Sequence, residues 1–106
     1  MFRGTTPKLE LEIDFDPKEL VNLYITFEQK EKVVLEKSLE DCHIVDNVII
    51  CPLTQDDTLK FVPTNDRSGA KRWLYIQARA TLQNGEAMST PIGRYEVERI
   101  LKEGII

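Results

Sequence analysis

Apolar and polar residues alternate along much of this chain with the period of two that is typical of half-buried β-strands. In residues 73–82 one face of the predicted strand is apolar and the other is mixed. The apolar residues are Leu74, Ile76, Ala78, Ala80 and Leu82, and they alternate with Trp73, Tyr75, Gln77, Arg79 and Thr81. The run is followed by Asn84-Gly85, a dipeptide that favours a two-residue turn because both central residues of such a turn need positive φ. The pattern therefore predicts a long central hairpin over residues 72–98.

Shorter runs of the same kind predict the remaining strands. They lie at residues 9–15, 23–27, 33–39, 44–45 and 48–51. Asp46-Asn47 supplies a two-residue turn between the last two of these runs. Counting back from that turn places Cys42 directly opposite Cys51, at a position where the two Cα atoms lie about 4.5 Å apart.

Two breaks in the strand pattern predict single helical turns. Asp16 precedes Pro17, and this order suits a helix cap followed by the first helical residue. Thr54 and Asp57 have the spacing of a capping box, with Asp in place of the preferred Glu. Side-chain-to-backbone turns at Thr54, Asp56 or Asp57 are the alternative. Residues 62–71, which contain Pro63, Asn65, Asp66, Ser68 and Gly69, predict an exposed, mobile loop.

Six or seven short strands separated by turn signals predict an all-β fold. We expect an antiparallel β-sandwich, immunoglobulin-like, with about seven strands and one short helical turn. A chain of 106 residues suits one domain with a core of its own, so residues 1–106 are predicted to form a single sandwich domain. The absence of long amphipathic patterns excludes doubly wound folds.

Composition narrows the range of partners. The net charge is -4, and an acidic chain without a basic patch argues against a nucleic-acid partner. The longest stretch with little charge, residues 43–55, still contains Asp46. No segment is therefore expected to span a membrane. The first twelve residues lack the apolar stretch of a secretory signal, so we expect no secretion by that route.

The residues that carry metal or covalent chemistry are few and unsuitably spaced. The chain has one His and two Cys, whereas a structural zinc site takes about four ligands with closely paired cysteines. Neighbouring strand residues point to opposite faces, so Cys42 and His43 do not meet as a nucleophile and its base. We therefore expect no catalytic, cofactor-binding or metal-binding residues, no cofactor and no enzyme activity, with both cysteines as free thiols in a reducing compartment.

The central hairpin holds the candidate interaction surface. Trp73 and Tyr75 share a face with Arg79, and the turn register pairs Tyr75 with Arg94. Such an aromatic row either contacts a partner or sugar, or is covered by the 66–71 loop or the opposite sheet. The same register places Pro91 opposite Ala78, which makes residues 88–93 an edge strand or a bulge. The predicted surface comprises Trp73, Tyr75, Arg79, Met88, Pro91 and Arg94.

Small residues of the hairpin form a second predicted contact, a patch that another element is able to approach closely. The patch comprises Ala78, Ala80, Ser89 and Gly93.

Taken together, four stretches of the chain resemble small β proteins encoded in the structural-gene clusters of phages and prophages of Gram-positive bacteria. The stretches are PKLELEIDF, LYITFEQKEKVVLEKSLEDC, VIICPLTQDDTLKF and IQARATLQNGEAMSTPIGRYEVERILKEGII. The resemblance implies a single β-sandwich that is a tail-associated or other virion protein, present in the host cytoplasm during assembly and then in the virion. It implies a homo-oligomer or contacts with other virion proteins, and no catalytic residues. The alternative is a small module that binds a carbohydrate or other small ligand on the exposed aromatic face.

Overall fold

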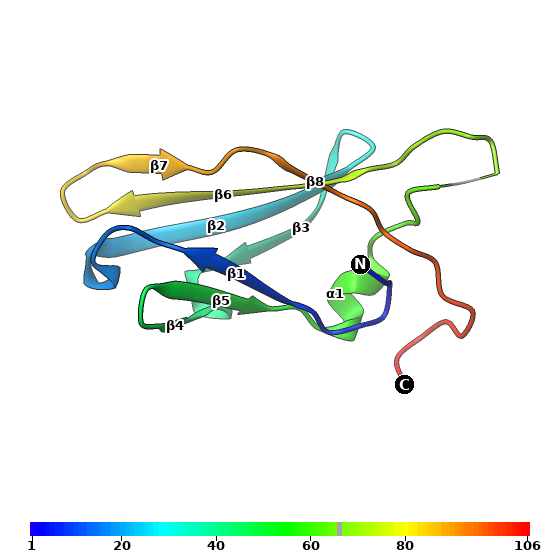
Figure 1. The fold of residues 1–106 in the computed structure, drawn as a ribbon, viewed down its shortest axis with the longest axis horizontal. Coiled ribbons are helices and arrows are strands. Elements are labelled where there is room, and N and C mark those ends of the chain that lie inside the picture. The colour runs from blue at the N-terminus through cyan, green and yellow to red at the C-terminus, as the bar shows by residue number, and fades with distance from the viewer. Residues whose placement is uncertain (66) are drawn as a thin grey trace.

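The computed structural model describes residues 1–65 and 67–106, and it consists mainly of two antiparallel sheets packed face to face (Figure 1). The predicted all-β sandwich is confirmed. Asp66, in the loop predicted near Trp73, lies outside the described residues. The two layers give an elongated molecule with principal extents of 48 × 28 × 17 Å.

The sheets contain three and five strands. In the small sheet the order is β1 (Lys8–Glu12), β5 (Val48–Pro52) and β4 (His43–Val45). In the large sheet it is β3 (Lys32–Ser38), β2 (Leu20–Gln29) and β6 (Leu74–Leu82), and β6 also pairs with β7 (Ala87–Ser89) and β8 (Gly93–Tyr95).

Three short helical turns connect the strands in the described part of the chain. They are η1 (Pro17–Glu19), η2 (Leu39–Asp41) and α1 (Gln55–Leu59). The two predicted turns are confirmed, because the Asp16 side chain accepts from the Lys18 N–H and Thr54 forms a complete capping box with Asp57. The turn η2 was not predicted.

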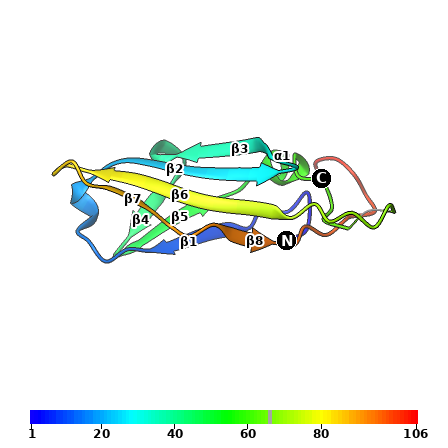
Figure 2. The same cartoon turned by 90° about the horizontal axis from the view of Figure 1, so that it is seen from above.

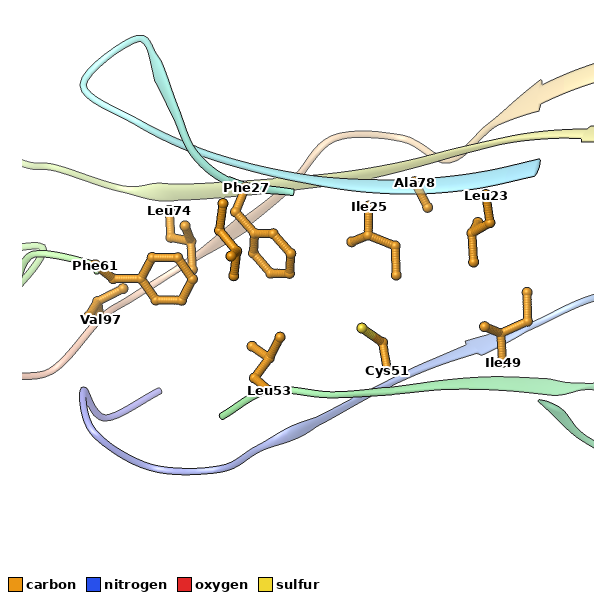
Figure 3. Packing of buried hydrophobic residues seen from close by; sticks show 11 residues of the cluster. Leu23, Ile25, Phe27, Ile49, Cys51, Leu53, Phe61, Leu74, Ala78 and Val97 are labelled. Carbon is orange, nitrogen blue, oxygen red and sulfur yellow. The ribbon is translucent and has the colours of Figure 1, made fainter. Parts of the chain in front are cut away.

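The core lies between the sheets, where the alternating apolar residues of the facing strands meet (Figure 3). Ile25 and Phe27 point from β2 towards the small sheet, and Cys51 points back from β5. Phe27 also stacks on Phe61, with ring centroids 5.7 Å apart. Burial of each such side chain contributes roughly 1.5–3 kcal/mol, so this apolar layer holds the two sheets together.

Buried polar side chains fasten the loops at one end of the sandwich. The Gln29 amide, only 2% exposed, donates to the carbonyl oxygens of Val62 and Arg72 and accepts from the Val62 N–H at 2.9 Å. The Thr64 hydroxyl accepts from the Val97 N–H at 2.7 Å. A buried polar group without a partner is costly, so these hydrogen bonds hold the backbone near Val62, Arg72 and Val97 in place.

The turn of the central hairpin differs from the prediction. The Leu82 N–H donates to the Glu86 carbonyl at 2.9 Å, which encloses three residues rather than two. Gly85 has a φ of 89°, whereas the Asn84 side chain accepts from the Glu86 N–H at 2.9 Å. Such a side-chain turn suits a type I turn followed by a left-handed glycine. The shift pairs Ala80 with Met88 instead of Ser89.

The return limb recovers the predicted register after a bulge. The Thr90 N–H donates to the Ala78 carbonyl at 2.9 Å, so Thr90, and not Pro91, lies opposite Ala78. From Gly93 onwards the pairs are as predicted, with Tyr75 opposite Arg94. One extra residue is therefore accommodated around Pro91, which has no N–H to pair. The prediction of a bulged edge strand is confirmed, although its exact register was wrong.

The turn between β2 and β3 has an unusual composition for its geometry. Lys30 and Glu31 have φ values of 54° and 63°, and they connect the paired residues Gln29 and Lys32. Positive φ at both central residues defines a type I′ turn, which normally contains Asn-Gly. A side chain with a Cβ in this region costs roughly 1–2 kcal/mol.

The double substitution Lys30→Asn and Glu31→Gly should therefore stabilise the protein by about 1 kcal/mol or more, because both new residues accept positive φ readily. Urea unfolding followed by circular dichroism measures the change. The control is Glu31→Ala, which removes the charge but keeps the Cβ and should bring no gain. Equal stabilisation by both variants would show that charge, and not backbone strain, limits this turn.

Candidate functional site

The six predicted surface residues lie together on β6, β7, β8 and their flanks. Tyr75 and Arg79 are exposed on β6, and Arg94 is exposed on β8. Met88 and Pro91 lie along the edge of the large sheet. The surface thus has two parts, an outer face with aromatic and cationic side chains and an apolar edge.

On the outer face, Trp73 is covered by a neighbouring side chain. The Arg94 guanidinium lies over its ring, 4.3 Å from the centroid. This cation–π contact contributes about 0.5–1 kcal/mol at an exposed site. Because the guanidinium occupies the ring face, Tyr75, which is 37% exposed, is the more accessible aromatic group of the pair.

A shallow hollow lies beside Tyr75 on the same face. It has a volume of about 260 Å³ and is lined by Thr26, Glu28, Gln77 and Ile92 in addition to Tyr75. An aromatic ring next to an amide and a carboxylate offers both stacking and hydrogen bonding, as small polar ligands require.

The edge strand β1 of the small sheet and the edge strand β8 of the large sheet lie along the same long side of the sandwich (Figure 2). We call this the open side, because β7 and β8 do not pair with β1 in the part of the chain that the structure describes. Within residues 1–65 and 67–106, none of these strands pairs with another strand at its outer edge. Two overlapping grooves of about 140 and 160 Å³ follow the opening. Their apolar lining includes Leu11, Ile13, Met88 and Pro91. Unpaired backbone and apolar side chains thus lie next to each other here.

The edge formed by residues 87–95 carries unusually little charge. Arg94 is its single charged residue, whereas β1 and β3 each carry three. Met88, Ile92 and Tyr95 on this edge are 39%, 63% and 47% exposed. Edge strands are normally protected by charged side chains. The edge at residues 87–95 has one such side chain, and the three-residue edge strand β4 has none.

The predicted patch of small residues is largely occupied by the chain itself. Ala78 is only 6% exposed and belongs to the core, and Ala80 packs against that core. A Cβ on Gly93 would lie 2.7 Å from the Tyr95 ring, so this ring covers the glycine. The space beside these small residues is therefore filled by the small sheet and by the Tyr95 ring.

On the opposite long side, the structure contains a buried ion pair that the sequence did not reveal. The Lys37 Nζ lies 2.8 Å from the Asp57 Oδ2, and the two side chains are 15% and 8% exposed. Lys37 shares the inner face of the large sheet with Ile25, its partner on β2. The same Asp57 oxygen accepts from the Thr54 N–H at 2.8 Å. One carboxylate thus caps α1 and joins it to β3.

The ion pair changes the proton affinities of both groups. Burial alone would lower the pKa of Lys37, but the hydrogen bond to Asp57 and its charge outweigh burial and raise it. Burial alone would raise the pKa of Asp57, but the bonds to Lys37 and Thr54 outweigh burial and lower it. Both groups therefore remain charged over a wide pH range.

Two thiols lie next to this pair. Cys51 is buried and Cys42 is half-buried, and the observed pairing of His43 with Ile50 confirms the register that predicted them opposite each other. Burial, with a hydrogen bond to Cys51, raises the pKa of Cys42 to about 12. The pKa of Cys51 is also raised, mainly by burial, although Cys42 and Lys37 act in the other direction.

The described residues contain no group of three or more side chains suited to hold a metal ion. In the same part of the chain, no helix has the length and apolar character needed to cross a membrane. Comparisons with protein-family models, with curated proteins and with solved structures found no match.

Replacement of Asp57 by Asn should lower the free energy of unfolding by about 2–4 kcal/mol at pH 7, because Lys37 loses its partner in a buried position. A depressed folded-state pKa stabilises the protein above the unfolded value, about 3.9, and this contribution disappears as the pH falls through the folded value. The difference between wild type and Asp57→Asn should therefore shrink below about pH 4.

Urea unfolding between pH 2 and pH 7 measures this difference. Asp56→Asn is the matched control, because Asp56 lies on the same helical turn but is exposed. That variant should stay within about 0.5 kcal/mol of wild type. A constant difference between wild type and Asp57→Asn across the whole pH range would contradict the assignment.

Proposed function

We propose that this protein is a non-enzymatic assembly protein whose open side binds a second copy of the same chain. The observation that supports this most directly is the edge at residues 87–95. It combines unpaired backbone, exposed apolar side chains and a single charge on the border of an apolar groove. Edges of this kind are where one subunit adds to another.

The charges along the open side favour a second copy as the partner. Glu10 and Glu12 are exposed on β1, and Arg94 is exposed on β8, on the other border of the opening. A two-fold axis through the opening would bring β1 of each copy against β8 of the other. Carboxylates would then face a guanidinium twice in one interface, which steers association and fixes its register.

Pro91 determines how this contact is made. The bulge interrupts the edge between β7 and β8, and each of these strands has three residues. A long continuous ladder with a second copy is therefore disfavoured. The interface we propose rests on the packing of Met88, Ile92 and Tyr95 into the partner's groove, with short stretches of strand pairing beside it.

The resemblance to phage and prophage structural proteins suggests where such an assembly operates. We propose a tail-associated or other virion role, with the protein first in the host cytoplasm. Genes for tail, portal or lysis proteins next to the gene for this chain would support the virion role. A neighbourhood of unrelated metabolic genes would oppose it without affecting the proposed dimer.

Substitution of Met88 and Ile92 by Lys should weaken self-association at least tenfold, because charges would enter an apolar interface. Multi-angle light scattering after gel filtration, over a wide range of concentrations, measures the fraction of dimer. The matched control is Val33→Lys, since Val33 is 59% exposed, close to the 63% of Ile92, but lies on the opposite edge strand β3.

Val33→Lys should associate like wild type. High salt should weaken the wild-type dimer, because the proposed charge pairs lie at a solvent-exposed interface. A wild-type protein that stays monomeric at millimolar concentration would refute the proposal. Loss of association in Val33→Lys alone would move the interface to β3.

The hollow beside Tyr75 supports a second candidate, a module that binds a small polar ligand such as a sugar. In that case Tyr75→Ala should abolish the amide chemical-shift changes that a monosaccharide panel produces around Gln77 and Ile92. Tyr24→Ala is the control, because Tyr24 is 48% exposed on the same face but does not line this hollow. An absence of shift changes in wild type at millimolar sugar would exclude this candidate for the sugars tested.

A further inference from the structure

The two thiols at the end of the β4–β5 hairpin, away from its turn, have unequal access to solvent. Cys42 lies one residue before β4 and is half-buried, and its Sγ donates to the Ser38 carbonyl at 3.4 Å. Cys51 lies within β5, is 1% exposed and points into the core (Figure 3). A dissolved reagent therefore reaches Cys42 first.

The positions of the two residues suit a disulfide. The ladder pairs Val45 with Val48, Ile44 with Ile49 and His43 with Ile50, so the next pair is Cys42 with Cys51. In a two-residue hairpin this is a non-hydrogen-bonded pair, with Cα atoms about 4.5 Å apart. Disulfides span Cα separations of about 4.4–6.8 Å, so a pair at this position is within bonding range.

The Lys37 ammonium completes the arrangement. It is held near the thiols by its ion pair with Asp57, and its charge favours the thiolate form of Cys51. Burial raises the pKa of both thiols, so the thiolate fraction at pH 8 is small and the exchange is slow. The positive charge of Lys37 opposes this effect at Cys51, which attacks as a thiolate in the second step.

We propose that Cys42 and Cys51 form a thiol–disulfide exchange site for small disulfides such as oxidised glutathione. Cys42 loses its proton and attacks one glutathione sulfur, which forms a mixed disulfide and releases the first glutathione, protonated, as a thiol. Cys51 then loses its proton and attacks the Cys42 sulfur, and the second glutathione leaves as a thiol. Two protein thiols are thereby oxidised to one disulfide while one glutathione disulfide is reduced to two thiols.

Three forms of the full chain test the proposal: wild type, Cys51→Ser and Cys42→Ser. Each is incubated with oxidised glutathione at pH 8, quenched with acid, alkylated and analysed by intact mass. Wild type should lose two hydrogen atoms and take up no alkyl group. Cys51→Ser should stop at the mixed disulfide on Cys42, and Cys42→Ser should form almost no adduct because Cys51 is buried.

Circular dichroism melts of each reduced variant establish that it is folded, and the reaction is read only below its melting temperature. Oxidised wild type should also melt several degrees higher than reduced wild type, since a new cross-link restricts the unfolded chain. Two fully alkylated thiols in folded wild type after the incubation would overturn the proposal. Equal glutathione adducts on Cys42→Ser and Cys51→Ser would overturn the assigned order of attack.

Discussion

The ion pair between Lys37 and Asp57 is the contact on which one side of this sandwich depends. Lys37 belongs to the edge strand of the large sheet, and Asp57 belongs to the helical turn that follows the small sheet. Because the carboxylate also completes the capping box of α1, hydrogen bonds to Thr54 hold it in position in addition to its contact with Lys37. The ion pair, the cap of α1 and the spacing between the two sheets thus depend on the same carboxylate, and its loss would affect all three.

Local signals in the sequence predicted most of the elements. Alternation over residues 73–82 located β6 to within one residue, and the cap residues Asp16 and Thr54 located two helical turns. The Asp46-Asn47 turn gave the correct register of β4 on β5. These predictions held because each depends on a few neighbouring residues whose preferences agree with the final fold.

The structure differs from the predictions where a side-chain hydrogen bond or a charge far away in the chain determines the local conformation. Asn84 used its side chain to cap the turn, so the hairpin gained a third loop residue that the dipeptide rule does not foresee. The sequence made no prediction for Lys37, because nothing local marks the acid that lies twenty positions away in the chain. The positions of Tyr75 and Arg94 followed from the hairpin. Met88 and Pro91, in contrast, lie one residue away from their predicted register. The open groove beside them required both sheets.

The two long sides of the sandwich contrast in a way that bears on assembly. The side at β3 is closed by α1 and the ion pair, and its edge strand carries three charged residues. The side at β8 has neither, and its apolar edge would be costly to leave in water. Pro91 and its bulge reduce the risk of unlimited strand addition there without covering the apolar residues. An edge that resists fibre-like pairing but still exposes Met88 and Ile92 is suited to a contact that closes after one partner has bound.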